Sequence, residues 1–232
     1  MTEGLNGAVG RVAVIGMTGL GLGAVVGGLL GRLAMFLLIR ASPDARGLVT
    51  DDGFEMGRFT LTGTLNLMLV GAILGVIGAA VYAAVRWLQP HGLGLRVAAT
   101  AACAGVGVGA LLVHQDGVDF AVLHAGFAIA LFVLVPALYG GLLALVVESV
   151  LSRHPDGVGP TGARWAGLLP FVLTPPVLPV FGVAWLLGRS LSPTKAGEFL
   201  RSSVWRAVGR GIAALAFLVL AQDLLLDTAA LT

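Results

Sequence analysis

The sequence predicts an all-α integral membrane protein, and three observations carry this prediction. The 232-residue chain is 57% hydrophobic and 11% charged, with a mean hydropathy of +0.97, whereas about a quarter of the residues of a soluble domain are charged. Its apolar residues form runs of about 20, which at 1.5 Å per residue cross a hydrocarbon core about 30 Å thick. Within lipid such runs must be helical, because a helix satisfies its own backbone hydrogen bonds.

Six apolar segments divide the chain, and each is long enough to cross a bilayer. They are residues 12 to 39, 60 to 85, 95 to 113, 121 to 147, 166 to 187 and 207 to 226. The loops between them are too short to fold separately, so we expect residues 1–232 to form a single polytopic membrane domain, a bundle of about six transmembrane segments. Every tryptophan falls near a segment end, where indole rings favour the membrane interface.

We expect the first segment to be a retained membrane helix with a stripe of glycines. It is much longer than the apolar region of a signal peptide, and no A-x-A-like site follows it. Glycine recurs every four residues at Gly19, Gly23, Gly27 and Gly31. These glycines share one slowly drifting face that another helix can approach closely, so we expect helix packing within the bundle rather than an oligomer interface or a pore lining.

The second and third segments repeat this spacing at Gly71 and Gly75 and at Gly105 and Gly109. The third segment also contains the single cysteine, Cys103. With one cysteine, neither a disulfide within the chain nor a multi-cysteine metal site is possible.

The fifth segment is rich in proline and is not expected to form a uniform helix. It contains Pro170, Pro175, Pro176 and Pro179, and each interior proline removes a backbone hydrogen bond and clashes with the preceding turn. The segment is either a kinked span or a re-entrant hairpin that turns at Pro175 and Pro176. A hairpin is tolerated only where it is buried in protein or lines a cavity.

The basic residues favour the hairpin. If all six segments span, five basic residues lie on the side of the N-terminus and eight on the other side. If the fifth segment re-enters, the residues from Arg189 to Arg210 change side, giving ten against three. Because cytoplasmic loops carry an excess of Lys and Arg, we predict five spans plus a hairpin in the cell membrane, with a cytoplasmic N-terminus. Six spans is the alternative. The preference for Arg over Lys, with abundant Gly and Ala, suggests a bacterial protein.

One acidic turn occurs twice, as LVTDDGFE at residues 48–55 and LVHQDGVD at residues 112–119. The 64-residue offset indicates a possible duplicated helix hairpin, as in some transporters. Asp-Gly is also simply a good turn, and acids cap helices. Alternatively, the two turns share an outer surface where carboxylates and imidazoles bind a divalent cation or relay protons. The residues of this possible cation site are Asp51, Asp52, Glu55, His114, Asp116, Asp119 and His124.

No spacing in these turns matches a known metal signature, so the sequence does not identify a metal. We expect no cofactor. Haem is a minor alternative, in which His114 and His124 bind one iron.

Arg32 lies within the apolar length of the first segment. A charge at this depth is costly and indicates a function and a partner, unless the side chain reaches the interface. Asp223, near the end of the last segment, is the predicted partner in a buried ion pair, and the two share a membrane level only if the fifth segment re-enters. Glu148 ends the fourth segment on the opposite side and is expected to be an interfacial acid.

Two functions remain nearly tied. The chain contains no HExxH motif, P-loop or nucleophile elbow, so we do not expect an enzyme. Its net charge of +2 comes mostly from arginines that flank the segments, which is no nucleic-acid footprint. One function is a small permease or cation- or proton-conducting protein. The other is a non-catalytic accessory or assembly subunit, packed in the bilayer against a membrane-protein partner or a second copy.

Overall fold

Every regular element in the described part of the chain is a helix. The computed structural model describes residues 2–43, 47, 60–113, 124–174, 177 and 203–231. Five helices in these residues are long and apolar enough to cross a membrane: Leu5–Ala41, Leu61–Leu88, Leu93–Leu112, Ala125–Arg153 and Arg206–Leu231. The all-helical class is confirmed, and the five long apolar helices agree with a membrane protein.

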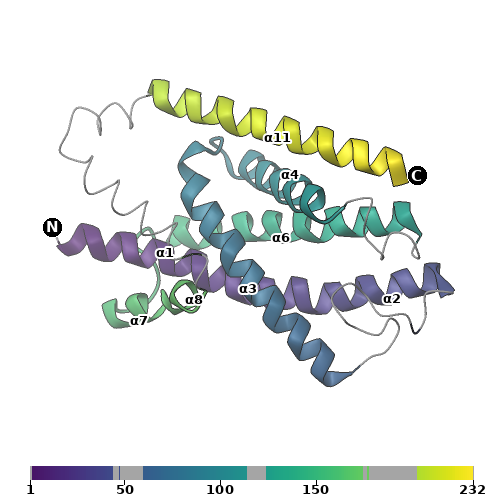
Figure 1. Cartoon of the computed structure of the whole chain (residues 1–232). Coiled ribbons are helices and arrows are strands. Elements are labelled where there is room, and N and C mark those ends of the chain that lie inside the picture. The colour runs from purple at the N-terminus through teal and green to yellow at the C-terminus, as the bar shows by residue number, and fades with distance from the viewer. Residues whose placement is uncertain are drawn as a thin grey trace.

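The first long helix has three parts and the others are simpler (Figure 1). The elements are α1 (Thr2–Leu22), the π-helical η1 (Gly23–Leu30), α2 (Gly31–Ala41), α3 (Leu61–Val85), the 3-10 turn η3 (Arg86–Leu88), α4 (Leu93–Leu112), α6 (Ala125–Arg153), α7 (Thr161–Ala166), α8 (Leu169–Val172) and α11 (Ser203–Leu231).

Successive long helices run in opposite directions, so α11 runs the same way as α1 (Figure 1). One end of the bundle therefore holds the N-terminus, the α3–α4 turn, the end of α6 and the start of α11; we call it the N-terminal end. The other end, which we call the C-terminal end, holds the end of α2, the start of α3 and the C-terminus. A hydrogen bond from Arg210 Nε to the carbonyl of Leu88, at 2.8 Å, ties α11 to the N-terminal end.

Glycines bring the first helix and α3 into backbone contact. A Cβ on Gly23 would lie 2.8 Å from the Cα of Gly75, and one on Gly27 would lie 2.7 Å from the Cα of Gly71. Gly19 likewise faces Gly75. In lipid, helices associate through such close packing because little hydrophobic drive exists between them. Gly31, the last glycine of the stripe, lies beyond the crossing and faces Leu67.

The π-helical segment keeps this stripe facing α3. In an α-helix, four residues exceed one turn by about 40°, so glycines at this spacing drift around the helix. A π-helix has wider turns, closed by i→i+5 hydrogen bonds, so four residues fall short of a turn and the drift reverses. Because η1 spans Gly23–Leu30, it holds Gly23 and Gly27 on the face that meets α3.

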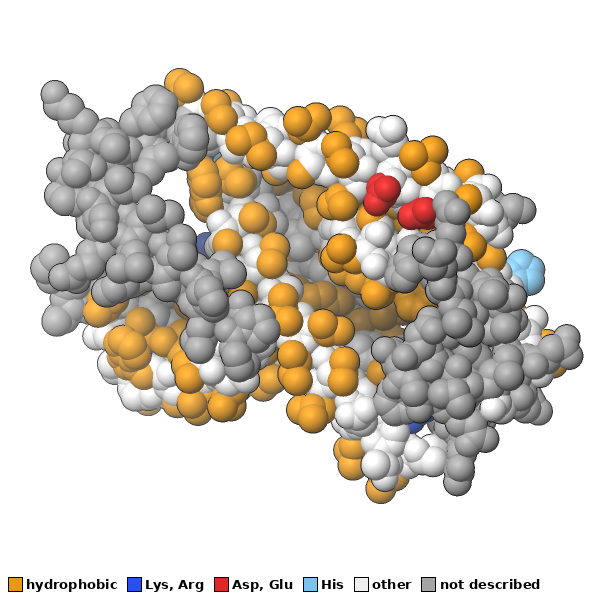
Figure 2. Space-filling model, in the orientation of Figure 1, with side chains coloured by type: hydrophobic (Ala, Val, Ile, Leu, Met, Phe, Trp, Pro, Cys, Tyr) orange, Lys and Arg blue, Asp and Glu red, His pale blue; other side chains and the backbone are white. Residues whose placement is uncertain are grey.

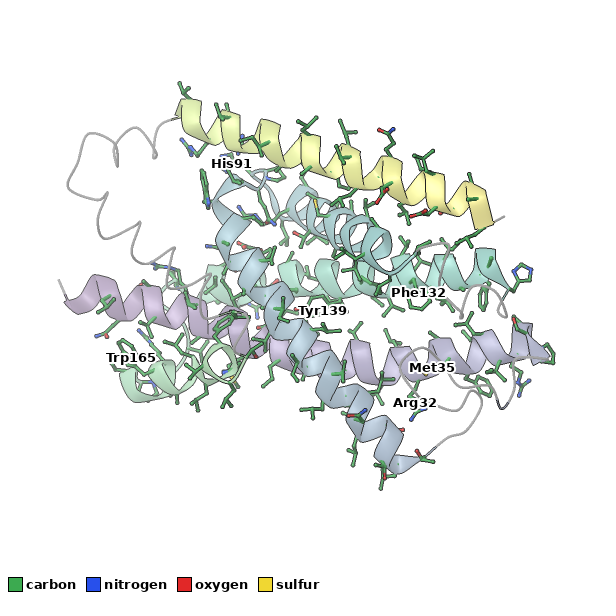
Figure 3. All side chains as sticks on the ribbon, in the orientation of Figure 1. Arg32, Met35, His91, Phe132, Tyr139 and Trp165 are labelled. Carbon is green, nitrogen blue, oxygen red and sulfur yellow. The ribbon has the colours of Figure 1, made fainter. Side chains whose placement is uncertain are left out.

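The pair formed by α4 and α6 is built in the same way. A Cβ on Gly140 would lie 2.6 Å from the Cβ of Ala104, and one on Gly105 would lie 3.0 Å from the Cβ of Ala137. The two helix pairs meet through a buried cluster that includes Val76, Leu143 and Val147. The hydroxyl of Tyr139 on α6 also donates to the carbonyl of Gly75 on α3 at 2.5 Å, where the two helices cross (Figure 3).

The described part of the proline-rich segment is broken, as its sequence predicts. α7 ends at Ala166, a turn follows, and α8 covers only Leu169–Val172. The hydroxyl of Thr174 donates to the carbonyl of Pro170 at 2.8 Å, and the buried ring of Phe171 lies against Gly16 of α1. The turn predicted at Pro175 and Pro176 lies outside the described residues, so the choice between a hairpin and a kinked span stays a prediction.

Candidate functional site

Four polar side chains from three helices meet at the N-terminal end of the bundle. Glu148 of α6 accepts hydrogen bonds from Arg86 Nε at 2.7 Å and Arg86 Nη2 at 3.0 Å. Arg96 Nη1 of α4 lies 2.6 Å from Glu148 Oε2, the oxygen that also accepts from Arg86 Nη2. The hydroxyl of Tyr82 on α3 donates to Glu148 Oε1 at 2.7 Å. We call these four residues the Glu148 cluster.

Local structure explains how these residues meet. Tyr82 and Arg86 are four positions apart, so they lie on one face where α3 continues into η3. The chain then turns at Gly92, whose φ of +97° suits glycine, and Arg96 follows in the first turn of α4. Glu148 lies near the end of α6, which reaches Arg153, so all four residues share one level.

The cluster is largely shielded and carries an excess of positive charge. The side chains of Glu148 and Arg96 are 14% and 17% exposed, and that of Arg86 is 30% exposed. Four donor contacts occupy both oxygens of one carboxylate, while two guanidinium groups surround it. Removing one partner of a buried ion pair typically destabilises a protein by about 3 to 5 kcal/mol. The Glu148 carboxylate therefore fastens α3, α4 and α6 together.

The sequence does not predict this cluster. From the sequence alone, Arg86 and Arg96 are flanking charges and Glu148 is an interfacial acid, because each stands at the end of an apolar segment. A signal was nevertheless present: both predicted topologies place Glu148 on the same side of the membrane as Arg86 and Arg96. An acid at the end of a long apolar run needs a partner. Arg86 and Arg96, at the ends of neighbouring apolar segments on the same side of the membrane, are basic residues that can reach it.

Arg32 and Asp223 have different neighbours. Arg32 lies just after η1, and its guanidinium lies against Gly63 at the start of α3. Figure 3 labels Arg32 between α2 and the start of α3. Asp223 is exposed on α11, where the next residue, Leu224, packs against Gly109 of α4. The predicted Arg32–Asp223 pair stays a prediction.

Most of the possible cation site lies outside the described residues. This applies to Asp51, Asp52, Glu55, His114, Asp116 and Asp119. His124 is exposed just before α6, and its backbone N–H donates to the hydroxyl of Ser42 at 2.8 Å. Within the described ranges, no group of three or more His, Cys, Asp or Glu could hold a metal ion. The cation site, the haem alternative and the duplicated hairpin stay predictions.

The last helix, α11, is the most exposed of the five long helices. Its most apolar stretch has no buried residue, against 11% to 39% for the other four. It contacts η3, α4 and α6, for example through Gly209 against Leu88 and through Leu224 against Gly109. Figure 2 shows acidic side chains on this helix among hydrophobic ones, and the acids of α11 are Asp223 and Asp227.

These features define a class: a protein whose described residues are helical, with five helices among them long and apolar enough to cross a membrane, joined by glycine contacts and a Glu–Arg cluster. No protein-family model matches the chain, and neither does a curated protein or a solved structure.

Proposed function

We propose that the protein is a non-catalytic subunit of a membrane assembly and binds a partner membrane protein through the outer face of α11. The observation that carries this proposal is the carboxylate of Asp223, which is exposed beside the exposed amide of Gln222. The surrounding exposed residues are hydrophobic: Ile212, Leu215, Leu218, Val219, Leu225 and Leu226. Acidic and amide groups on such a face need a polar partner when the helix is in lipid.

The depth of Asp223 sharpens this requirement. Arg210 contacts the α3–α4 turn, which we place at the membrane boundary. Asp223 follows 13 residues later, about 20 Å along the helix, so it lies about 10 Å inside the far boundary of a core about 30 Å thick. A charged residue at the helix centre costs about 2.5 to 3.5 kcal/mol on insertion scales. A partner that neutralises Asp223 would remove much of this cost.

Charge identifies the kind of partner. Two copies inserted in the same orientation are related by an axis along the membrane normal. A symmetric contact through α11 would therefore set Asp223 against Asp223, and like charges repel. A transmembrane helix of another protein, with Lys or Arg at the depth of Asp223, satisfies the carboxylate instead.

Photo-crosslinking in intact membranes tests this proposal. A photoreactive residue at Leu218 on α11 should yield one discrete protein adduct. The adduct should disappear with Asp223→Leu, whereas Val219→Ala should leave it. A photoreactive residue at Leu65, equally exposed on α3, is the matched control and should not yield the adduct. The captured protein must carry Lys or Arg at this depth, and exchanging the two charges between the proteins should restore the adduct.

Three results would contradict the proposal. The first is an adduct with twice the mass of the chain, which would indicate a homodimer. The second is an adduct that Asp223→Leu leaves unchanged. The third is strong coupling in a double-mutant cycle of Arg32→Leu and Asp223→Leu, which would give Asp223 a partner within the chain.

The orientation in the membrane is part of the same proposal. We place the N-terminal end of the bundle in the cytoplasm, since Arg11, Arg86, Arg96, Arg153 and Arg164 share this end with the start of α11. In a Cys103→Ser background, an impermeant thiol reagent added to intact cells should label a cysteine at Ala230 but not one at His91. Labelling of both positions from one side would rule out the five-span arrangement.

A small permease or a cation- or proton-conducting protein is the second candidate function. The broken helices α7 and α8 and the π-helical η1 favour it, because interrupted helices often form the binding sites of transporters and π-helical turns often occur at functional sites. Flux measurements in proteoliposomes test it. Ion or proton flux above that of empty liposomes would support this candidate. Flux no greater than that of empty liposomes, for every ion tried, would count against it.

A further inference from the structure

We infer that the N-terminal end of the bundle binds the phosphate of an anionic phospholipid, whose acyl chains lie in the apolar hollow between α3 and α4. This inference is independent of the α11 partner. It begins with the charges at the junction of η3, α4, α6 and α11. Both oxygens of Glu148 are occupied by Arg86, Arg96 and Tyr82, so the two guanidinium groups retain one uncompensated positive charge.

Arg210 adds a third guanidinium to this junction. Its Nε donates to the carbonyl of Leu88 at 2.8 Å and its Nη2 to that of Gln89 at 3.4 Å. The side chain is exposed, and these two bonds fix its direction and, within the described part of the chain, use Nε and Nη2 but not Nη1. Arg206, also exposed, is one turn earlier on the same face of α11. Figure 3 shows the α3–α4 turn, marked by His91, beside the start of α11.

The chemistry of these groups suits a phosphate. A guanidinium presents a planar fork of donors that matches phosphate oxygens, and charge-assisted bonds of this type are strong. The side chain of Arg86 remains 30% exposed, with Nη1 not used by Glu148. Arg86 and Arg210 thus present donors from two elements, η3 and α11, that the Leu88 and Gln89 contacts hold together.

The surroundings favour a lipid over a free phosphate. Trp87 is 48% exposed beside these arginines and contacts the face of α11 at Gly209, as expected of an indole at the membrane interface. From their turn, α3 and α4 diverge (Figure 1), and Figure 2 shows a hollow between them with hydrophobic side chains along it. Basic pockets between membrane helices are known sites for anionic headgroups.

Thermal unfolding of the full-length protein in a neutral detergent tests this inference. Phosphatidylglycerol should raise the unfolding temperature, while phosphatidylcholine with the same acyl chains should raise it less. Glycerol phosphate and inorganic phosphate, which lack acyl chains, should leave it unchanged. Arg210→Gln should lose the response to phosphatidylglycerol. Arg153→Gln, an exposed arginine at the same end of the bundle, is the matched control and should retain it.

Each other outcome overturns the inference. Equal shifts with phosphatidylglycerol and phosphatidylcholine would show that the charge of the headgroup is not recognised. A shift with inorganic phosphate as large as that with the lipid would indicate a site for free phosphate. Equal losses with Arg153→Gln and Arg210→Gln would indicate diffuse attraction to a basic surface. If Arg210→Gln does not fold, Arg206→Gln takes its place and should reduce the lipid shift.

Discussion

The helices α3 and α11 are similar in length and both are apolar enough to cross a membrane, but they are held in opposite ways. The most apolar stretch of α3 is 39% buried, whereas that of α11 has no buried residue. The difference lies in small residues: Gly71 and Gly75 bring α3 into backbone contact with the first helix, while a Cβ on Gly211 of α11 would meet nothing within 4 Å. In a bilayer, hydrophobicity places a helix in the membrane, but glycines decide which helices become the core.

The largest effect should come from removing the carboxylate that fastens α3 but not α11. Glu148→Leu leaves the shielded guanidinium groups of Arg86 and Arg96 without an acid, so we expect a loss of about 3 to 5 kcal/mol. The measurement is the free energy of unfolding in mixed micelles by circular dichroism. Asp156→Asn is the control, because the Arg11–Asp156 pair is 3.8 Å apart and exposed and should contribute about 0 to 1 kcal/mol. Equal losses would show that the Glu148 cluster is only a surface feature.

The next effect should come from the glycine contact itself. Gly23→Leu places a side chain against the backbone of α3 and should lower stability by about 1 to 3 kcal/mol or more, as overpacking does. Gly21→Leu is a close control on the same helix, since a Cβ at Gly21 meets nothing within 4 Å. Thermal aggregation of the purified variants gives the comparison. Similar melting of both variants would mean that the two helices are not in close contact.

Two tyrosine hydroxyls at α3 allow a hydrogen bond to a charged acceptor to be compared with one to a neutral acceptor. Tyr139→Phe removes the donor to the Gly75 carbonyl and should cost about 0.5 to 1.5 kcal/mol. Tyr82→Phe removes a donor to the Glu148 carboxylate and should cost about 1.5 to 3 kcal/mol. Chemical unfolding of the two variants, side by side, decides the order. A larger loss of unfolding free energy for Tyr139→Phe than for Tyr82→Phe would show that the bond to the Gly75 carbonyl stabilises the protein more than the bond to the carboxylate does.

The smallest effect is expected on the outer face of α11. Leu218→Ala changes a side chain that is 62% exposed and should alter the stability of the isolated protein by less than about 0.5 kcal/mol. Leu224→Ala, on the inner face against Gly109, should cost more. The same unfolding measurement applies to both. A large loss for Leu218→Ala in the purified protein would mean that α11 is covered by the rest of the chain.

The sequence predicted whatever depends on local composition. Runs of apolar residues predicted long helices, and the prolines predicted that the fifth segment would not be a uniform helix, in agreement with the short α7 and α8. The spacing of Gly19, Gly23 and Gly27 predicted a closely packed face, and the structure places α3 against it. Contacts between helices that are far apart in the sequence were not predicted. Arg86 and Glu148 are 62 residues apart, and no local pattern links them. The π-helical geometry of η1 was also missed, because no local pattern in GAVVGGLL distinguishes wider turns from α-helical ones.

The π-helical segment also sets the phase of everything that follows it. Its wider turns take up extra residues compared with an α-helix. A π-helix turns by less per residue than the 100° of an α-helix, so converting η1 to α geometry at unchanged length would rotate α2 relative to α1. Arg32 would then leave Gly63, and Ser42 would leave the His124 N–H that it accepts, although neither contact had been mutated. A change of helix geometry in η1 would thus be felt at the C-terminal end of the bundle, where an exchange of one apolar side chain for another that kept the wider turns would not.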